Sequence, residues 1–313
     1  MKRILIGILC LCLLLGGCAA GAEPTVLHNS TYFIDDLGRS VTVTEPKRIA
    51  VLLGSYAQIC QLAGAYVCSA PDDAWEDLDL DMPADAVNLG STEKLNLELL
   101  LSSKPDLVIA STKRRQHVEW MDTLNAAGIP VAYFNIDDFD DYLRILQLLT
   151  GFTDRHDLYE TNGTAVRNQI NAVLAQSRQR LEGKEGPTVL CMTASASTIR
   201  AQNSEGTVLG AMLKTLGCRN VADSDQMLLD SLSIERILEV DPEYIFFVQR
   251  GDDAAGMQAY VRQMLTTHPA WASLTAVKNG RVYFMEKELY NLKPNHRWGE
   301  AYEKLEAILA NGG

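Results

Sequence analysis

Residues 96–109 read NLELLLSSKPDLVI and residues 233–246 read SIERILEVDPEYIF, so two stretches 137 positions apart align without a gap. Each stretch begins with a residue that caps helices, carries an acid in the first turn and continues as a short helix. Each then has a proline beside an acid, followed by an apolar run typical of a buried strand. The repeat predicts two similar α/β lobes.

Apolar runs and helical patterns extend this plan through both halves of the chain. The predicted strands are Ile49–Leu53, Leu107–Ala110, Val131–Phe134, Thr188–Met192, Tyr244–Val248 and Arg281–Phe284. The predicted helices run from about Ser55 to Gly64, from about Arg115 to Gly128 and over Val208–Leu216. Two earlier runs, Tyr32–Ile34 and Val41–Val43, predict a β-hairpin. Because strands that alternate with helices form βαβ units, we expect a mainly parallel sheet in each lobe.

The expected division of the chain combines these patterns with what the N-terminal motif described below implies. It comprises a signal peptide at 1–17, a lipidated cysteine and tether at 18–30, an N-terminal lobe at 31–152, a linker helix at 153–186 and a C-terminal lobe at 187–313. Apolar residues fall near helical spacing in the linker, and the rest of it is mostly polar, as in an exposed amphipathic helix. A helix of this length reaches about 40 Å, which is enough to join two lobes.

The N-terminus has the three-part layout of a secretory signal peptide. Lys2 and Arg3 precede the apolar stretch Ile4–Leu15, which is shorter than the roughly 20 residues of a membrane span. Gly16 and Gly17 then precede Cys18, and small residues before a cysteine resemble the lipobox of bacterial lipoproteins. The resemblance implies that Cys18 is lipidated, although an ordinary signal peptide with an incidental cysteine is the alternative.

Charge and cysteine usage narrow the functional classes. The 313-residue chain has a formal net charge of −12, which argues against a nucleic-acid partner because such binding depends on Lys and Arg. Four cysteines follow the lipobox without the spacing of a metal site, and both disulfides and buried free thiols are compatible with them. They are Cys60, Cys68, Cys191 and Cys218.

Several motifs resemble one family of transport proteins. They are Asp36–Arg39 with Pro46–Ile49, Lys104–Ile109, and Val277–Tyr283. In this order they resemble the helical-backbone solute-binding proteins that serve ABC importers of ferric siderophores, haem and cobalamin. The resemblance implies two lobes joined by a stiff helix, a shallow cleft and no catalysis. It also implies a monomer tethered to the outer face of the cell membrane, with a permease and its ATPase subunits as partners.

Two glutamates occupy equivalent positions in the repeat. In the family that the chain resembles, one Glu on each lobe docks into basic pockets of the permease, and Glu98 and Glu235 match those positions. An acid in the first turn of a helix also interacts favourably with the helix dipole, by about 0.3–1 kcal/mol. Both roles are compatible with the sequence.

Ligands of open α/β sheets bind beyond the carboxyl ends of the strands, which locates the candidate contacts. They are Ser55, Tyr56, Thr112, Lys113, Arg114, Arg200, Gln249, Arg250, Tyr290, Arg297 and Trp298. Grouped cations in an acidic chain favour an anionic ligand such as a ferric siderophore, because Arg donates well to carboxylate and catecholate oxygens. The aromatic residues of the set are expected to pack on a flat ligand. No cofactor is expected besides this iron chelate.

The sequence leaves other ligands and other functional classes as alternatives to ferric siderophore binding. Haem requires an axial ligand, for which Tyr56, Tyr290 or His296 are candidates, and cobalamin requires aromatic walls. A zinc or manganese site requires converging ligands, whereas the five histidines are scattered. An enzyme is disfavoured because no catalytic motif is present and Ser195 and Ser197 lack an evident base. A structural envelope lipoprotein does not need two repeated lobes.

Overall fold

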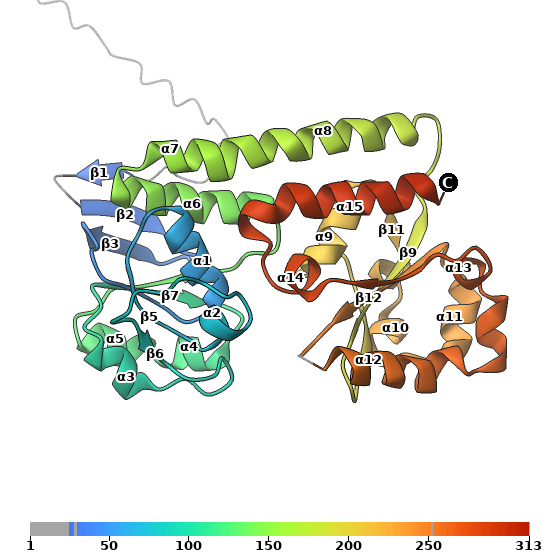
Figure 1. The fold of residues 1–313 in the computed structure, drawn as a ribbon, viewed down its shortest axis with the longest axis horizontal. Helices are drawn as coiled ribbons and strands as arrows, with labels where there is room; N and C mark the ends of the chain where they lie inside the picture. Colours follow the sequence, from blue (N-terminus) through green and yellow to red (C-terminus); the bar gives the residue numbers. More distant parts are fainter. Residues whose placement is uncertain (1–24, 28–29, 252, 313) are drawn as a thin grey trace, which may run out of the picture.

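In the computed structural model, two sheets lie side by side below a layer of long helices (Figure 1). The structure describes residues 25–27, 30–251 and 253–312. The expected signal peptide and Cys18 lie outside the described residues. Within those same ranges, no helix is long and apolar enough to cross a membrane.

The N-terminal sheet is entirely parallel, with strand order β6-β5-β4-β7-β8. The strands are β4 (Ile49–Val51), β5 (Val67–Ala70), β6 (Val87–Asn88), β7 (Leu107–Ser111) and β8 (Val131–Phe134). All residues of β4, β5, β7 and β8 are buried, as expected for parallel strands covered on both faces. The lobe's helices are α1 (Gly54–Leu62), α2 (Asp73–Glu76), α3 (Leu97–Ser102), α4 (Arg115–Glu119), α5 (Met121–Ala126) and α6 (Phe139–Thr153).

A small antiparallel sheet precedes this lobe. It contains β1 (Thr25–Leu27), β2 (Ser30–Ile34) and β3 (Ser40–Thr44), and the β2–β3 pair is the hairpin that the sequence predicts. Asp35 fixes its turn, since the carboxylate accepts hydrogen bonds from the backbone N–H groups of Leu37 and Arg39 and from the Arg39 guanidinium. Tyr133 N, in β8, also donates to Asp35, so the hairpin is attached to the central sheet.

The C-terminal sheet is mainly parallel, with strand order β10-β9-β12-β13 and β11 paired to β9. Its strands are β9 (Thr188–Ala194), β10 (Ile199–Gln202), β11 (Arg219–Asn220), β12 (Tyr244–Gln249) and β13 (Val282–Met285). Only β10 runs antiparallel to its neighbour among the pairs of described strands in this sheet. Around it lie α9 (Val208–Thr215), α10 (Gln226–Asp230), α11 (Ile234–Val240), α12 (Ala254–Val261), α13 (Thr275–Lys278) and α14 (Lys287–Tyr290).

The sequence repeat corresponds to a structural repeat. Helix α3 leads into β7 and helix α11 leads into β12. The Asn96 side chain accepts from Leu99 N at 3.1 Å, and the Ser233 side chain accepts from Arg236 N at 3.1 Å, so both helices are capped in the same way. The predicted two-lobed α/β architecture is confirmed.

One long helical segment, α7 to α8, spans the two lobes, with α6 below its first part and α15 below its second part (Figure 1). Residues 156–180 are helical without interruption, as α7 (His156–Tyr159), a π-helical turn (Glu160–Thr164) and α8 (Ala165–Arg180). Gly163 allows the π turn to lie against α6, since a Cβ at this position would be 2.9 Å from Leu143 Cδ2. Helix α15 (Trp298–Asn311) lies beside α8, and Arg180 makes a bidentate ion pair with Glu306 across the two helices. The sequence patterns predict neither α6 nor α15.

Candidate ligand-binding cleft

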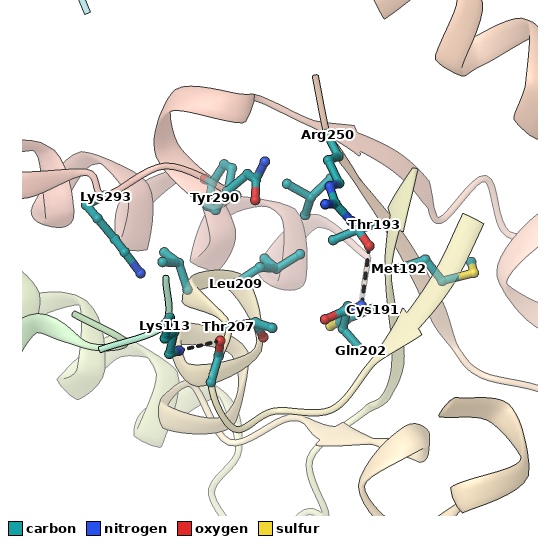
Figure 2. Close-up of a pocket in the computed structure, with 14 residues that line it drawn as sticks. Lys113, Cys191, Met192, Thr193, Gln202, Thr207, Leu209, Arg250, Tyr290 and Lys293 are labelled. Carbon is teal, nitrogen blue, oxygen red and sulfur yellow. Dashed lines mark hydrogen bonds between the residues drawn. The ribbon is translucent and has the colours of Figure 1, made fainter. Parts of the chain in front are cut away.

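The carboxyl ends of strands from both sheets meet at a cleft of about 740 Å³. Leu53, Ser111 and Asn135 bring the ends of β4, β7 and β8 to one wall, and Ser195 and Arg250 bring those of β9 and β12 to the other. A second pocket of about 440 Å³ extends from this cleft into the C-terminal lobe, and Figure 2 shows its lining. The two cavities share four lining residues, which are Lys113, Arg250, Asn291 and Lys293.

Basic side chains predominate along both cavities. The cleft is lined by Lys113, Arg114, Arg250, Lys287 and Lys293. Its lining acids are Asp73, Asp77 and Glu93. A positive cleft in a chain of net charge −12 requires that these cations be concentrated by the fold. The lining of the cleft thus has more basic than acidic side chains.

Two lysines reach across the boundary between the lobes. Lys113 Nζ lies 2.5 Å from Asp137 Oδ1 and donates to the carbonyl oxygen of Gly206, in the other lobe, at 3.2 Å. Lys293 Nζ donates to the carbonyl oxygen of Ile136 and lies 4.0 Å from Asp137 Oδ1. Burial lowers the pKa of Lys293 to about 8, Asp137 opposes this shift and Lys113 adds to it. One carboxylate thus holds two cations at the cleft.

The remaining cations lie at the rim. Arg114 pairs with Glu93 at 2.8 Å, and Lys287 with Asp77 at 3.2 Å. The hydrogen bond and charge of Arg114 lower the pKa of Glu93, and Arg250 adds to this effect from the opposite lobe. Arg250 itself makes no side-chain hydrogen bond or ion pair with any described residue, so its guanidinium is available to a ligand.

Asp73 contributes less negative charge than an ordinary carboxylate. Burial raises its pKa to about 6, although the backbone N–H of Gly54 donates to both carboxylate oxygens at 3.0 Å and opposes the shift. A Cβ on Gly54 would lie 2.8 Å from Asp73 Oδ1, so the close approach requires glycine. The cleft is therefore more positive below neutral pH than its residue count indicates.

The cavities contain part of the predicted contact set. Ser55, Tyr56, Lys113, Arg114 and Arg250 line the cleft, and Tyr290 lines the pocket beyond it. Both tyrosine rings are buried, with 2% and 3% of their surface exposed, and their hydroxyls donate to Phe134 O at 2.8 Å and Ala301 O at 3.0 Å. With so little of each ring exposed, the expected packing on a flat ligand is not supported.

The other predicted contacts line neither cavity. Trp298 is fully buried, where it packs against Phe139 and Tyr302 in the core between α6 and α15, so its assignment to the cleft is wrong. Arg297 makes a bidentate ion pair with Glu300 in the first turn of α15. Arg200 is an exposed residue of β10.

The predictions of Thr112 and Gln249 miss the cavity lining by one position in the sequence. Thr112 donates its backbone N–H to Phe134 O in the sheet, whereas its neighbours Ser111 and Lys113 line the cleft. The Gln249 side chain donates to Gly251 O. Because alternate residues of a strand point to opposite faces, an error of one position moves a side chain out of a site.

The sequence reasoning missed three polar residues between β13 and α15. They are Lys287, Asn291 and Lys293. The same segment supplied predicted aromatic contacts, but its lysines were not chosen. Two lysines within seven positions of an acidic chain, close to Pro294, were the available signal.

The structure also locates the two predicted docking glutamates and the four cysteines. Glu98 and Glu235 are exposed in the first turns of α3 and α11, one on each lobe. Cys60, Cys68, Cys191 and Cys218 are buried free thiols, which answers the question of disulfides left open by the sequence. No cluster of three or more metal-ligating side chains occurs among residues 25–27, 30–251 and 253–312.

Two α/β lobes whose strand ends enclose a positive cleft define a bilobal solute-binding protein. A model of the periplasmic binding protein family matches residues 49–289, and the chain belongs to this family. Members of the family are the substrate-binding components of ABC importers and are not enzymes. The predicted family is thereby confirmed.

Individual relatives share this fold at low sequence identity. The Fe(3+)-citrate-binding protein YfmC of Bacillus subtilis is 23% identical over 292 residues, covering 89% of this chain and 87% of that protein. Staphylococcus aureus SirA, solved with staphyloferrin B, has a TM-score of 0.68 and 20% identity, covering 90% of this chain and 98% of that chain. S. aureus IsdE, solved with heme, has a TM-score of 0.64 and 16% identity, covering 84% and 98%. Because these ligands differ, the fold alone does not select the solute.

Proposed function

We propose that this protein captures an anionic ferric siderophore in the cleft between its lobes and delivers it to an ABC permease. The observation that carries the proposal is the concentration of five cations along the cleft of a chain with net charge −12. Arg and Lys donate charge-assisted hydrogen bonds to carboxylate and catecholate oxygens. The names of two relatives, a ferric citrate binder and a structure holding staphyloferrin B, support iron chelates as the ligand class.

Haem receives less support from the cleft. Haem iron takes an axial His, Tyr, Met or Cys ligand. No histidine is among the described residues that line either cavity, and the hydroxyls of Tyr56 and Tyr290 already donate to backbone carbonyls. Cys191 and Met192 belong to the pocket lining, but they are buried in the sheet, with 2% and 0% of their surface exposed. Cobalamin needs aromatic walls, which these two buried rings do not provide.

Titration of the protein from Ala19 onward tests the ligand class. The panel comprises ferric citrate, ferric catecholate and hydroxamate chelates, haem and cobalamin, with intrinsic tryptophan fluorescence as the readout. We expect saturable binding of an anionic ferric chelate that weakens about tenfold or more in Arg250→Ala, because a charge-assisted contact is lost. Arg219→Ala is the control, since Arg219 pairs with Glu185 and lines neither cavity. Tight binding of haem or cobalamin alone would refute the proposal.

Delivery is proposed to depend on Glu98 and Glu235, with Cys18 as the lipid anchor on the extracytoplasmic face. The two carboxylates are exposed on different lobes, so a permease with two basic pockets can bind both at once. Changing both to Gln is expected to abolish chelate uptake by cells while leaving chelate affinity in solution unchanged. The control is Glu160→Gln with Glu182→Gln, which alters two exposed acids of the connecting segment. Normal uptake by the first double variant would refute this docking role.

A further inference from the structure

The pocket in the C-terminal lobe is chemically distinct from the cleft that leads to it. Its lining contains three cations and no carboxylate among the described residues. Lys113 and Lys293 lie on one side of it and Arg250 lies on the other (Figure 2). Asp137 faces both lysines but is not part of the lining, and it neutralises one charge of the three. A surplus of positive charge remains at the entrance.

Part of the pocket wall is apolar. Val208, Leu209, Val248 and Cys191 form it, whereas the Met192 side chain points away from the pocket into the core on the opposite face of the sheet (Figure 2). Besides the three cations, the polar side chains among the described lining residues are Thr193, Gln202, Thr207, Tyr290 and Asn291. An apolar wall with cations at the entrance matches a hydrocarbon arm that carries an anionic group, because the arm removes apolar surface from water while the anion meets the cations.

The local backbone adds to this preference. Helix α9 starts at the pocket, and no side chain caps its first turn. The hydroxyl of Thr207, in the capping position, donates to Asn203 O instead. The first N–H groups of a helix carry partial positive charge, so they reinforce the effect of the three cations.

We propose that this pocket is a subsite for a pendant carboxylate arm of the ferric chelate, whose iron-bearing core occupies the larger cleft. The inference rests on the proposed function and narrows its substrate class to chelates that keep a free carboxylate away from the metal. Together the two cavities extend the ligand site from the boundary between the lobes to the sheet of the C-terminal lobe.

Thr193 offers a variant that alters this pocket without touching the cleft. It lines the pocket, does not line the cleft, and accepts a hydrogen bond from Gln202 Nε2 at 3.3 Å. Thr193→Glu adds a negative charge to the subsite, and Thr193→Gln adds a side chain of the same size without charge. The ratio of their affinities therefore isolates charge from steric effects and from the lost hydrogen bond.

Two ferrioxamine B derivatives serve as probes, since they share one iron-binding core. In one the terminal amine is acetylated and neutral, and in the other it is succinylated and ends in a carboxylate. We expect the succinyl chelate to bind about tenfold more weakly to Thr193→Glu than to Thr193→Gln, and the acetyl chelate to bind both variants equally. Equal binding of the succinyl chelate by the two variants would overturn the subsite.

A second measurement decides the matter if neither probe binds. Citrate without iron, compared with NaCl at matched ionic strength, is expected to raise the melting temperature of Thr193→Gln and not that of Thr193→Glu. Equal shifts in the two variants would overturn the subsite. Failure of the proposed function has a different signature, in which no ferric chelate of the panel binds while the citrate shift still depends on residue 193.

Discussion

Raising the pH from 7 to 9 is expected to weaken chelate binding through the deprotonation of Lys293. This side chain is 22% exposed and sits where the lobes meet, with its Nζ bonded to Ile136 O and near Asp137. Its pKa of about 8 lies well below the ordinary value of 10.5, chiefly because burial disfavours the charged form. The free protein therefore loses the positive charge of Lys293 at a pH at which most lysines remain protonated.

The size of the effect follows from linkage. A bound anion favours the protonated lysine, and we take the pKa in the complex to return to the ordinary value. The free protein is then about 90% protonated at this residue at pH 7 and about 10% at pH 9, whereas the complex stays protonated. Binding at pH 9 must take up a proton, so the Kd should rise about tenfold, or about 1.4 kcal/mol.

The assay is a fluorescence titration with the bound ferric chelate at several pH values between 7 and 9, run on the wild type and on Lys293→Arg. Arginine stays charged throughout this range, so the variant should show a flat Kd whatever its absolute affinity. Changes in the chelate itself affect both proteins equally and cancel in the ratio. A wild-type Kd that is flat, or a Lys293→Arg slope equal to that of the wild type, would refute the reasoning.

Two further predictions concern stability. Glu306→Gln leaves Arg180 without its ionised partner between α8 and α15. It should lower the free energy of unfolding by about 3 kcal/mol, measured by urea titration. A change below about 0.5 kcal/mol would show that the pair is solvated. Asn295 has φ +52° and donates to Ser55 O and Gln58 Oε1. Both Asn295→Ala and Asn295→Gly lose these hydrogen bonds, but glycine adopts a positive φ without strain, so Asn295→Ala should lower the melting temperature more. The reverse order would contradict this account.

The sequence predicts the fold best where pattern and local chemistry agree. The repeat at 96–109 and 233–246 identifies two capped helices that lead into buried strands, and the structure contains both. The predicted helix from Arg115 to Gly128 is instead two helices, α4 and α5, divided at Trp120. Helix α15 was missed because its partners are distant in the sequence, and its apolar face has meaning only against α8 and α6.

Which of the predicted residues lie at the cleft has a geometric reason. Residues directly after a strand, such as Lys113 and Arg250, are placed at the cleft by the topology of parallel sheets. The segment beyond β13 has no such constraint, because its path depends on how α15 returns to α8. In this segment, the prediction from residue type chose Trp298 and left out Lys293. Trp298 is buried in the core because its ring has a large apolar surface, whereas the long side chain of Lys293 reaches the cleft.

The ion pairs of the cleft explain how an acidic protein keeps its cations ready for a ligand. Lys113 contacts Asp137 in its own lobe and Gly206 in the other, so one lysine both neutralises an acid and bridges the lobes. An anion that displaces such contacts replaces one set of charge-assisted hydrogen bonds with another. Arg250 has no side-chain partner among the described residues, so its contact with the anion displaces none. Because Asn295 donates to Ser55 O and Gln58 Oε1 and Trp298 packs against Phe139, large rotation between the lobes would have to break these contacts between the start of α15 and the N-terminal lobe. Affinity in this protein should therefore depend on cations positioned before binding rather than on closure around the ligand.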